Sequence, residues 1–203
     1  MEQFLSDSEV RVLGALIEKE ITTPDYYPLS LNALMSACNQ SSNRYPVVQF
    51  SEDVVGSAVD SLREKKLVRL LDRGESRVAK YRHILYEALE LTRPSIAVLC
   101  MLMLRGPQTS GEIRTRSTRL YDFSSIEEVE TVLNSLMAGE KPLITRLPRQ
   151  PGQKEVRYAH TMSGEVRVVE EPEAPQELDR IAKLEKEIED LKRQFEEFRK
   201  QFE

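Results

Sequence analysis

The sequence predicts a mainly α-helical α+β protein in which a small unit, three helices followed by a β-hairpin, occurs twice and precedes a C-terminal coiled-coil helix. A basic residue, Tyr, any residue and His occur in that order at residues 80–83 and again at 157–160. Upstream of each copy lies a helix-like stretch with the same apolar spacing and a shared Ser-Leu pair, Ser61-Leu62 and Ser135-Leu136. Repetition of the whole order of elements indicates a duplicated domain.

Three helices are predicted in the first unit. Residues 6–9, Ser-Asp-Ser-Glu, form a capping box that opens a helix running to about Ile21. Ser30 is placed to cap a second, short helix. Ser51 precedes two carboxylates that suit a helix N-terminus, and it caps a third helix that we expect to reach Lys66.

The second unit repeats this plan. An apolar helix covers residues 96–104, with Pro94 in its first turn. Residues 109–112, Thr-Ser-Gly-Glu, form another capping box before a short helix that ends near Thr118. Ser125 opens the third helix. Because the first of these helices is apolar nearly all round, we expect it to be central to the packing between the units.

A β-hairpin is predicted at the end of each unit. Residues 67–71 and 77–84 predict two strands about a turn with Gly74 at its tip, and residues 143–147 and 155–162 predict the second pair. Three helices followed by a hairpin are the winged-helix arrangement. The predicted organisation is a winged-helix domain at 1–92, a second at 93–164, an acidic linker at 165–176 and a coiled-coil helix at 177–203.

The predicted C-terminal helix carries apolar residues at unbroken intervals of three and four. These candidate dimerisation residues are Ile181, Leu184, Ile188, Leu191, Phe195, Phe198 and Phe202. The spacing is that of a coiled-coil seam, and the early Ile and Leu choices favour two parallel strands. We expect a homodimer formed through this helix. The alternative, that the helix folds back on its own chain, stays open.

The composition indicates where the protein is expected to be located, the state of its cysteines and how its charge is distributed. The N-terminus lacks the pattern of a signal peptide and no apolar stretch is long enough to span a bilayer, so we expect a cytoplasmic protein without a membrane partner. Cys38 and Cys100 lack the spacing of a metal or redox site, which predicts buried, reduced thiols. Residues 93–164 contain 10 basic and 7 acidic residues, whereas residues 165–203 contain 8 basic and 13 acidic ones. The acidity of the chain therefore belongs mostly to its tail.

Three segments resemble a known bacterial family. They are residues 39–47, residues 104–109 with 111–114, and residues 147–152 with 157–160. They are similar to the motifs of the YceH-like family, a domain of unknown function, over about residues 5–164. The resemblance implies tandem winged helices in a bacterial cytoplasmic protein and implies little about function.

Charge decides between modes of nucleic-acid binding. A winged helix commonly places the start of its third helix in the major groove, but here those turns carry Glu52 and Asp53, or Glu127, Glu128 and Glu130. This disfavours the usual docking mode for both units. The candidate nucleic-acid-binding residues are instead those near the second helix and hairpin of the second unit: Arg114, Arg116, Arg119, Arg146, Arg149, Lys154 and Arg157. The alternative for each is a solvated surface residue.

Basic groups also occur in the first unit, where the solvated-surface interpretation is favoured. They are Arg63, Lys65, Lys66, Arg73, Arg77 and Lys80. We expect Arg44 to order its Asn/Ser-rich loop rather than contact a ligand.

The hypothesis favoured by this sequence is a DNA-associated regulatory protein. The alternative is a protein-protein interaction scaffold that uses the acidic third helices and does not bind nucleic acid. An enzyme is the weakest hypothesis, because the sequence has no Gly-rich phosphate loop, metal-ligand spacing or nucleophile motif, and no cofactor is expected. His83 and His160, at matching strand ends, are interpreted as structural residues, and Tyr81 and Tyr158 as hairpin core residues.

Overall fold

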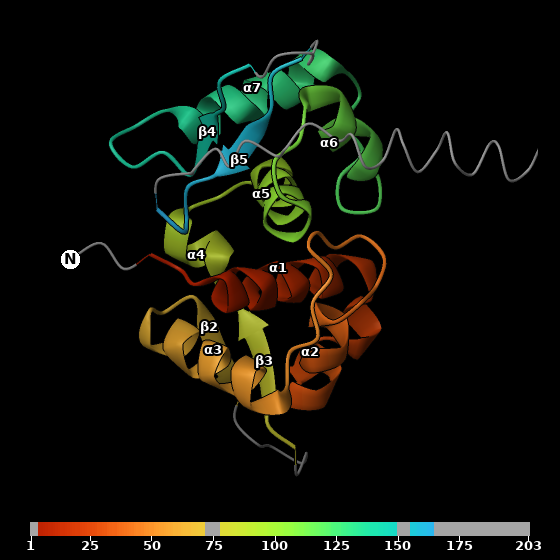
Figure 1. Cartoon of the computed structure of the whole chain (residues 1–203), viewed down its shortest axis with the longest axis vertical. Helices are drawn as coiled ribbons and strands as arrows, with labels where there is room; N and C mark the ends of the chain where they lie inside the picture. The colour runs from red at the N-terminus through yellow and green to blue at the C-terminus, as the bar shows by residue number, and fades with distance from the viewer. Residues whose placement is uncertain (1–3, 72–77, 150–154, 165–203) are drawn as a thin grey trace, which may run out of the picture. The chain divides into compact units, whose positions relative to one another are not determined.

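The computed structural model describes residues 4–71, 78–149 and 155–164, and it is an α+β structure with small antiparallel sheets (Figure 1). Helix α1, Asp7–Thr22, begins at the predicted capping box. The Ser6 amide donates to Glu9 Oε2 at 2.6 Å, and the Glu9 amide donates to Ser6 Oγ at 3.3 Å. Every residue from 9 to 18 is buried, so α1 lies inside the protein rather than on its surface.

Two further helices complete the helical part of the first unit. Helix α2, Leu31–Cys38, is capped by Ser30, and α3, Glu52–Glu64, is capped by Ser51, as predicted. Helix α3 ends short of the expected Lys66. The reason is that Lys66 has a φ of 57°, which lies in the left-handed region, while the Leu67 amide donates to Leu62 O and closes the turn.

The first hairpin pairs β2, Val68–Leu71, with β3, Lys80–His83, and a third strand joins it. The additional strand, β1 at Leu29–Ser30, lies against β3, so the strand order is β1-β3-β2. The predicted turn at residues 72–77, with Gly74, Arg73 and Arg77, lies outside the described residues.

The second unit contains α5, α6 and α7. Helix α5 spans Arg93–Arg105, with Thr92 as its cap and Pro94 in its first turn. Helix α6, Ser110–Arg116, begins at the predicted capping box and ends two residues before the expected Thr118. Helix α7, Ile126–Met137, is capped by Ser125.

The second hairpin pairs β4, Ile144–Arg146, with β5, Tyr158–His160. Its register matches that of the first hairpin: Ile144 lies opposite His160 as Val68 lies opposite His83. The duplicated order of helices and strands predicted from the sequence is therefore present within the described residues.

Three short elements were not predicted. They are η1 at Pro24–Tyr26, strand β1, and α4 at Leu85–Leu89. Helix α4 joins the two units. Ile84 occupies its N-cap position but makes no side-chain capping hydrogen bond. At its C-terminus, Glu90 rather than a glycine adopts the left-handed conformation, with a φ of 50°. The helix lacks the local signals that mark a helix in a sequence.

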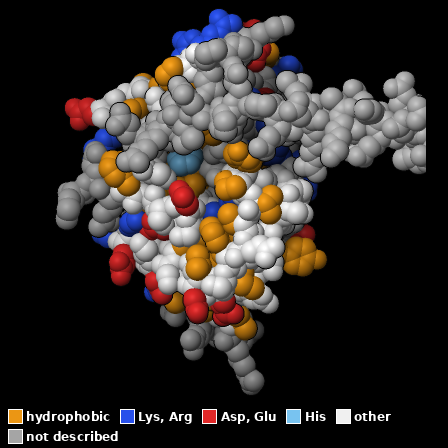
Figure 2. All heavy atoms as spheres, viewed as in Figure 1, with side chains coloured by type: hydrophobic (Ala, Val, Ile, Leu, Met, Phe, Trp, Pro, Cys, Tyr) orange, Lys and Arg blue, Asp and Glu red, His pale blue; other side chains and the backbone are white. Residues whose placement is uncertain are grey.

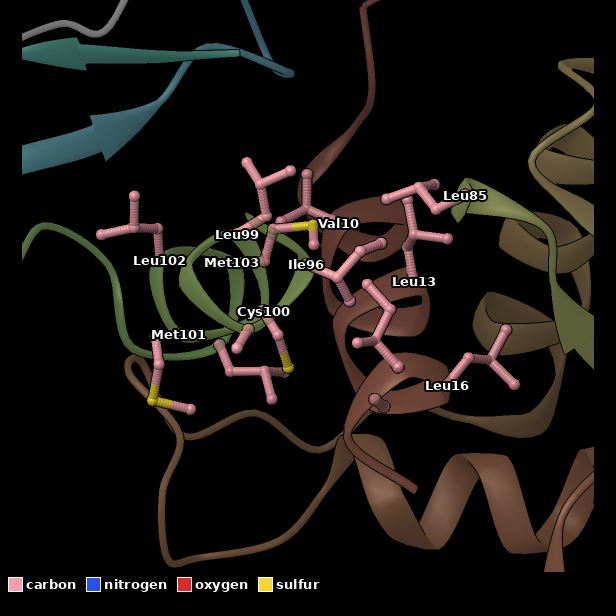
Figure 3. Close-up of a cluster of buried hydrophobic side chains, with 14 of the residues drawn as sticks. Val10, Leu13, Leu16, Leu85, Ile96, Leu99, Cys100, Met101, Leu102 and Met103 are labelled. Carbon is pink, nitrogen blue, oxygen red and sulfur yellow. The ribbon is translucent and has the colours of Figure 1, made fainter. Parts of the chain in front are cut away.

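The two units share one core, formed where α1 crosses α5. Residues 95–104 of α5 are all buried, matching residues 9–18 of α1. Figure 3 shows Ile96 of α5 directed towards α1, where Val10 and Leu13 lie. The helices approach closely at Gly14, because a Cβ built there would lie 2.9 Å from Leu104 Cδ2. The expectation that the first helix of the second unit is central to the packing is confirmed.

The tail lies outside the described residues, and with it the predicted coiled-coil seam of Ile181, Leu184, Ile188, Leu191, Phe195, Phe198 and Phe202. Among the helices that the structure describes, none is both long and apolar enough to cross a membrane.

Candidate nucleic-acid interface

Glu112 in the first turn of α6 brings two of the predicted arginines together. Its carboxylate accepts from the Thr109 amide at 3.0 Å, as expected of a capping box. It also lies 2.9 Å from Arg157 Nη1 on the hairpin side and 3.3 Å from Arg116 Nη2 one turn along α6. Two guanidinium groups share one carboxylate, so positive charge remains in excess at this point.

Main-chain and amide oxygens fix the same two arginines further. Arg157 Nη1 donates to Pro107 O at 2.9 Å, and Arg116 Nη1 donates to Gln108 Oε1 at 3.3 Å. Gln108 is buried, and its backbone exchanges two hydrogen bonds with Tyr158 of β5. These bonds attach the α5–α6 connection to the hairpin. Because Arg116 and Arg157 both donate to this connection, it helps to fix their positions.

Arg114 lies elsewhere on α6. Its Nε and Nη2 donate to the main-chain oxygens of Phe123 and Ser124, at 3.4 and 3.0 Å. Arg114 therefore stabilises the segment before α7 and does not join Arg116 and Arg157. The predicted set does not form a single uniform cluster.

The hairpin arginines line an open groove of about 760 Å³ between the hairpin and the starts of α6 and α7. Its residues include Ser110, Gly111, Ile126, Glu130, Arg146 and Arg149. Arg119, in the α6–α7 connection, and Arg146 are exposed, and neither makes an ion pair or side-chain hydrogen bond with another described residue. Lys154 lies outside the described residues. Figure 2 shows Lys and Arg side chains at the end of the molecule formed by α7 and the second hairpin.

The start of α7 remains acidic, as the sequence indicated. Glu128 accepts hydrogen bonds from the Ser124 amide and hydroxyl and from the Tyr121 hydroxyl, at 2.7 to 2.9 Å. The Ser124 bonds lower the pKa of Glu128, and a bond from Ser125 lowers the pKa of Glu127, so both carboxylates stay charged. This turn repels phosphate.

Two of the basic residues named in the first unit form ion pairs with described carboxylates. Lys65 lies 2.6 Å from the buried Glu9, and Arg63 lies 2.9 Å from Asp60. Carboxylates gather at the end of the molecule where α3 lies (Figure 2). These contacts support the interpretation of the first-unit cations as structural or solvated residues.

A polar junction that the sequence analysis did not predict connects the units beside Arg116. The Tyr45 amide donates to Leu104 O at 2.8 Å, and Arg105 donates to Asn43 Oδ1. The loop itself is held by Arg44, which is buried and donates to both oxygens of Glu18, as expected for a residue that orders its loop. Sequence signals existed in the Asn/Ser-rich loop and in Arg105, but only the fold places them together.

Comparison with known proteins identifies the family. Residues 5–153 match the family described as "Protein of unknown function, DUF480". The chain belongs to the DUF480 family. It is 52% identical to a UPF0502 protein of Geotalea uraniireducens over all of both chains. It is 52% identical to another from Pelobacter propionicus, over 95% of this chain and 92% of that one, and 45% identical to a UPF0502 protein of Aliivibrio fischeri, over 98% and 96%.

The paired histidines of this DUF480 chain occupy matching strand positions but have different surroundings. His83 Nε2 lies 2.8 Å from Glu20 Oε2, and its Nδ1 accepts from the Leu85 amide at 3.3 Å. With Nδ1 as the acceptor, Nε2 is the ring nitrogen that donates to Glu20. His160 Nδ1 is buried without a hydrogen-bond partner among the described residues, and burial lowers the pKa of this ring.

Both cysteines are buried free thiols, as predicted. Burial raises the pKa of Cys38 to about 12 and raises that of Cys100 as well, which keeps both protonated and unreactive. Within the described ranges, no three His, Cys, Asp or Glu side chains are placed to hold a metal ion.

Proposed function

We propose that this DUF480 protein is a cytoplasmic tandem winged-helix protein that associates with DNA in a regulatory role, as the YceH-like resemblance suggested for its architecture. Three helices precede each hairpin, and the two hairpins share one register, which supports the winged-helix interpretation. The C-terminal seam supports a homodimer. Sedimentation of the full chain and of a Leu191→Glu variant tests this: the variant should sediment as a monomer, and a native monomer would contradict the dimer.

The observation that carries the DNA proposal is the excess of exposed arginine around α6 and the second hairpin. Arg116 and Arg157 are held in place by Glu112, and Arg119 and Arg146 have no acidic partner among the described residues. Prepositioned guanidinium groups lose less entropy when they bind phosphate. Because the α7 start is acidic, duplex DNA would contact α6 and the hairpin rather than receive α7 in its major groove.

Replacement of Arg119 and Arg146 by Gln tests this proposal. Neither side chain forms an ion pair with a described residue, so the double variant should keep the native melting temperature. If both contact phosphate, the slope of log affinity for a mixed-sequence duplex against log salt should fall by about 1.8, since each contact contributes about 0.9.

The first hairpin offers a matched control. Arg69 and Lys80 are exposed on β2 and β3, and replacement of both by Gln removes the same charge from the first unit. This control should leave the salt slope unchanged. Equal losses in the two double variants would indicate nonspecific attraction by net charge and contradict the proposed interface.

A scaffold for protein partners is the second candidate, and a specific observation favours it. The first turn of α3 exposes Val54, and that of α7 exposes Ile126, each at 40% and each beside carboxylates. An apolar side chain within an acidic face suits a basic protein partner. We propose binding rather than catalysis in either case, because His83 is used in internal hydrogen bonds.

A further inference from the structure

The described parts of the three segments on which the family resemblance rests are linked by contacts, the first segment to the second and the second to the third. The loop between α2 and α3 contacts the α5–α6 connection through the Tyr45 amide, which donates to Leu104 O, and through Asn43, which accepts from Arg105. The α5–α6 connection in turn contacts β5, because Arg157 donates to Pro107 O. In Figure 1 this loop lies beside the connection that follows α5. We call the surface formed by Asn43, Tyr45, Arg105, Gly106 and Arg116 the junction surface.

The Tyr45 ring is presented to solvent on a rigid support. Two arginines anchor the loop that carries Tyr45. Arg11 donates to Cys38 O at 3.1 Å and to Pro46 O at 2.5 Å, and Arg44 is buried beneath the loop. Tyr45 nevertheless remains 60% exposed. A Cβ at Gly106 would lie 3.5 Å from Tyr45 Cδ1, so one edge of the ring rests against the Gly106 backbone.

Two arginines lie near this ring: Arg105 is between Leu104 and Gly106, which both contact Tyr45, and the charge of Arg116 acts on Arg105. Arg105 makes no ion pair with a described carboxylate, and burial followed by the nearby charge of Arg116 lowers the pKa of its guanidinium. Among the described residues, the carboxylates that contact cations here are Glu112 and Glu18. Glu112 is shared by Arg116 and Arg157, and Glu18 by Arg44 and Lys19. Each carboxylate serves two cations, so the junction surface carries a net positive charge.

We propose that the junction surface binds single-stranded nucleic acid, with an unpaired base stacked on Tyr45 and the adjoining phosphates on Arg105 and Arg116. An exposed aromatic ring beside a basic surface is the combination by which proteins hold single strands. Bases inside a duplex are already stacked and are not accessible to such a ring. A protein partner would require several apolar side chains at the centre of its interface, whereas the large apolar side chains that this loop exposes are Tyr45 and Val47, beside the two arginines. The inference rests on the proposed nucleic-acid function and assigns to it a second surface, which shares Arg116 with the first.

A tryptophan at position 45 provides a direct readout. The chain contains no Trp, so Tyr45→Trp introduces a single fluorophore at the junction surface. Addition of a short oligothymidylate to the full-length protein should quench its fluorescence through stacking. Tyr26, which is 79% exposed on η1, supplies the control, and Tyr26→Trp should not be quenched. Equal quenching of the two variants, or quenching of neither, would overturn the inference.

Affinity measurements separate stacking from charge. Tyr45→Ala should weaken oligothymidylate binding by about 5- to 150-fold, which is the effect of losing about 1 to 3 kcal/mol of base stacking. Tyr45→Phe keeps the ring and should bind like the native protein; a Phe variant as weak as the Ala variant would contradict stacking. Arg105→Gln should lower the salt slope by about 0.7, whereas Arg63→Gln on α3 should not.

The outcomes distinguish this inference from the proposed function. If the native protein binds duplex DNA through Arg119 and Arg146 but Tyr45→Ala binds oligothymidylate like the native protein, the junction inference alone fails. If the native protein binds neither duplex nor single strand at low salt, both fail. Quenching of Tyr45→Trp by a basic peptide or protein but not by oligothymidylate would assign the surface to a protein partner and overturn the inference.

Discussion

Arg44 and Glu18 form a buried ion pair with two hydrogen bonds, at 3.0 Å between Nη1 and Oε1 and at 2.6 Å between Nη2 and Oε2. Arg44 also donates to Ala37 O at 2.9 Å, so its charge is satisfied although the side chain is wholly enclosed. This pair attaches the α2–α3 loop to α1. With Arg11, it is a polar anchor of the loop that presents Tyr45.

Glu18→Gln should destabilise the protein substantially. The substitution leaves the Arg44 charge buried without its counter-ion, for which the expected cost is about 3 kcal/mol in the free energy of unfolding. The exposed pair Arg63 and Asp60 supplies the control, and Asp60→Asn should cost less than about 1 kcal/mol. Urea unfolding measures both, and similar costs in the two variants would show that the buried pair does not anchor the loop.

Acid should weaken the native protein more than it weakens Glu18→Gln. Burial raises the pKa of Glu18, but Arg44 and Lys19 together outweigh burial and lower it below the ordinary value of 4.5; Lys65, Ser6 and Ser61 together do the same for Glu9. A carboxylate with a lowered folded-state pKa stabilises the fold above its unfolded pKa, and this stability is lost as pH falls through the folded value.

The free energy of unfolding should therefore fall as pH drops below about 4.5, and less steeply in Glu18→Gln, where Glu9, Glu127 and Glu128 still contribute but Glu18 does not. Urea unfolding at about pH 7 and about pH 3 gives the comparison. Identical acid dependence in the two proteins would show that the Glu18 carboxylate does not contribute.

Two helical glycines should respond to alanine with opposite signs. At Gly14 a Cβ would meet Leu104 Cδ2 at 2.9 Å and Met103 Cβ at 3.3 Å, so Gly14→Ala should force α1 and α5 apart and cost about 1 to 3 kcal/mol. At Gly56 of α3 the nearest atom is Leu31 Cδ2 at 3.8 Å. Gly56→Ala should stabilise by about 0.5 to 1 kcal/mol. Thermal unfolding of both variants tests how closely the units pack, and a stabilised Gly14→Ala would refute the close crossing.

The two histidines should differ in their tolerance of an apolar ring. His160→Phe removes a buried nitrogen that has no partner among the described residues, so it should be neutral or stabilising. His83→Phe leaves the Leu85 amide without its acceptor and Glu20 without its donor, and should cost about 1 to 3 kcal/mol. The melting temperatures of the two variants test this prediction. Equal losses in His83→Phe and His160→Phe would contradict it.

Local sequence signals predicted most of the fold. Capping side chains at Ser6, Ser30, Ser51, Thr109 and Ser125 each mark a helix start in the structure. Strand β1 and helix α4 were missed because β1 is defined only by pairing with distant Tyr81 and Lys80, and α4 lacks a cap.

The candidate site was predicted less completely, for the same reason. The sequence showed the arginines but not the groups that accept their hydrogen bonds. Arg157 donates to Glu112, which is 45 residues away in the sequence. Arg114 donates to main-chain oxygens of the segment before α7. The junction depends on Arg105 and Asn43, which are separated by 62 residues. Long-range contacts of this kind follow from the crossing of α1 and α5, which no local pattern specifies.

The measurement that most directly tests the central claim is the affinity of the full-length protein for a mixed-sequence DNA duplex at about 50 and about 200 mM salt. If the arginines of α6 and the second hairpin contact phosphate, binding should be submicromolar at the lower salt concentration and should fall steeply at the higher one. Absence of binding at low salt would contradict the DNA-associated role and leave the acidic faces of α3 and α7, as docking surfaces for protein partners, as the better account.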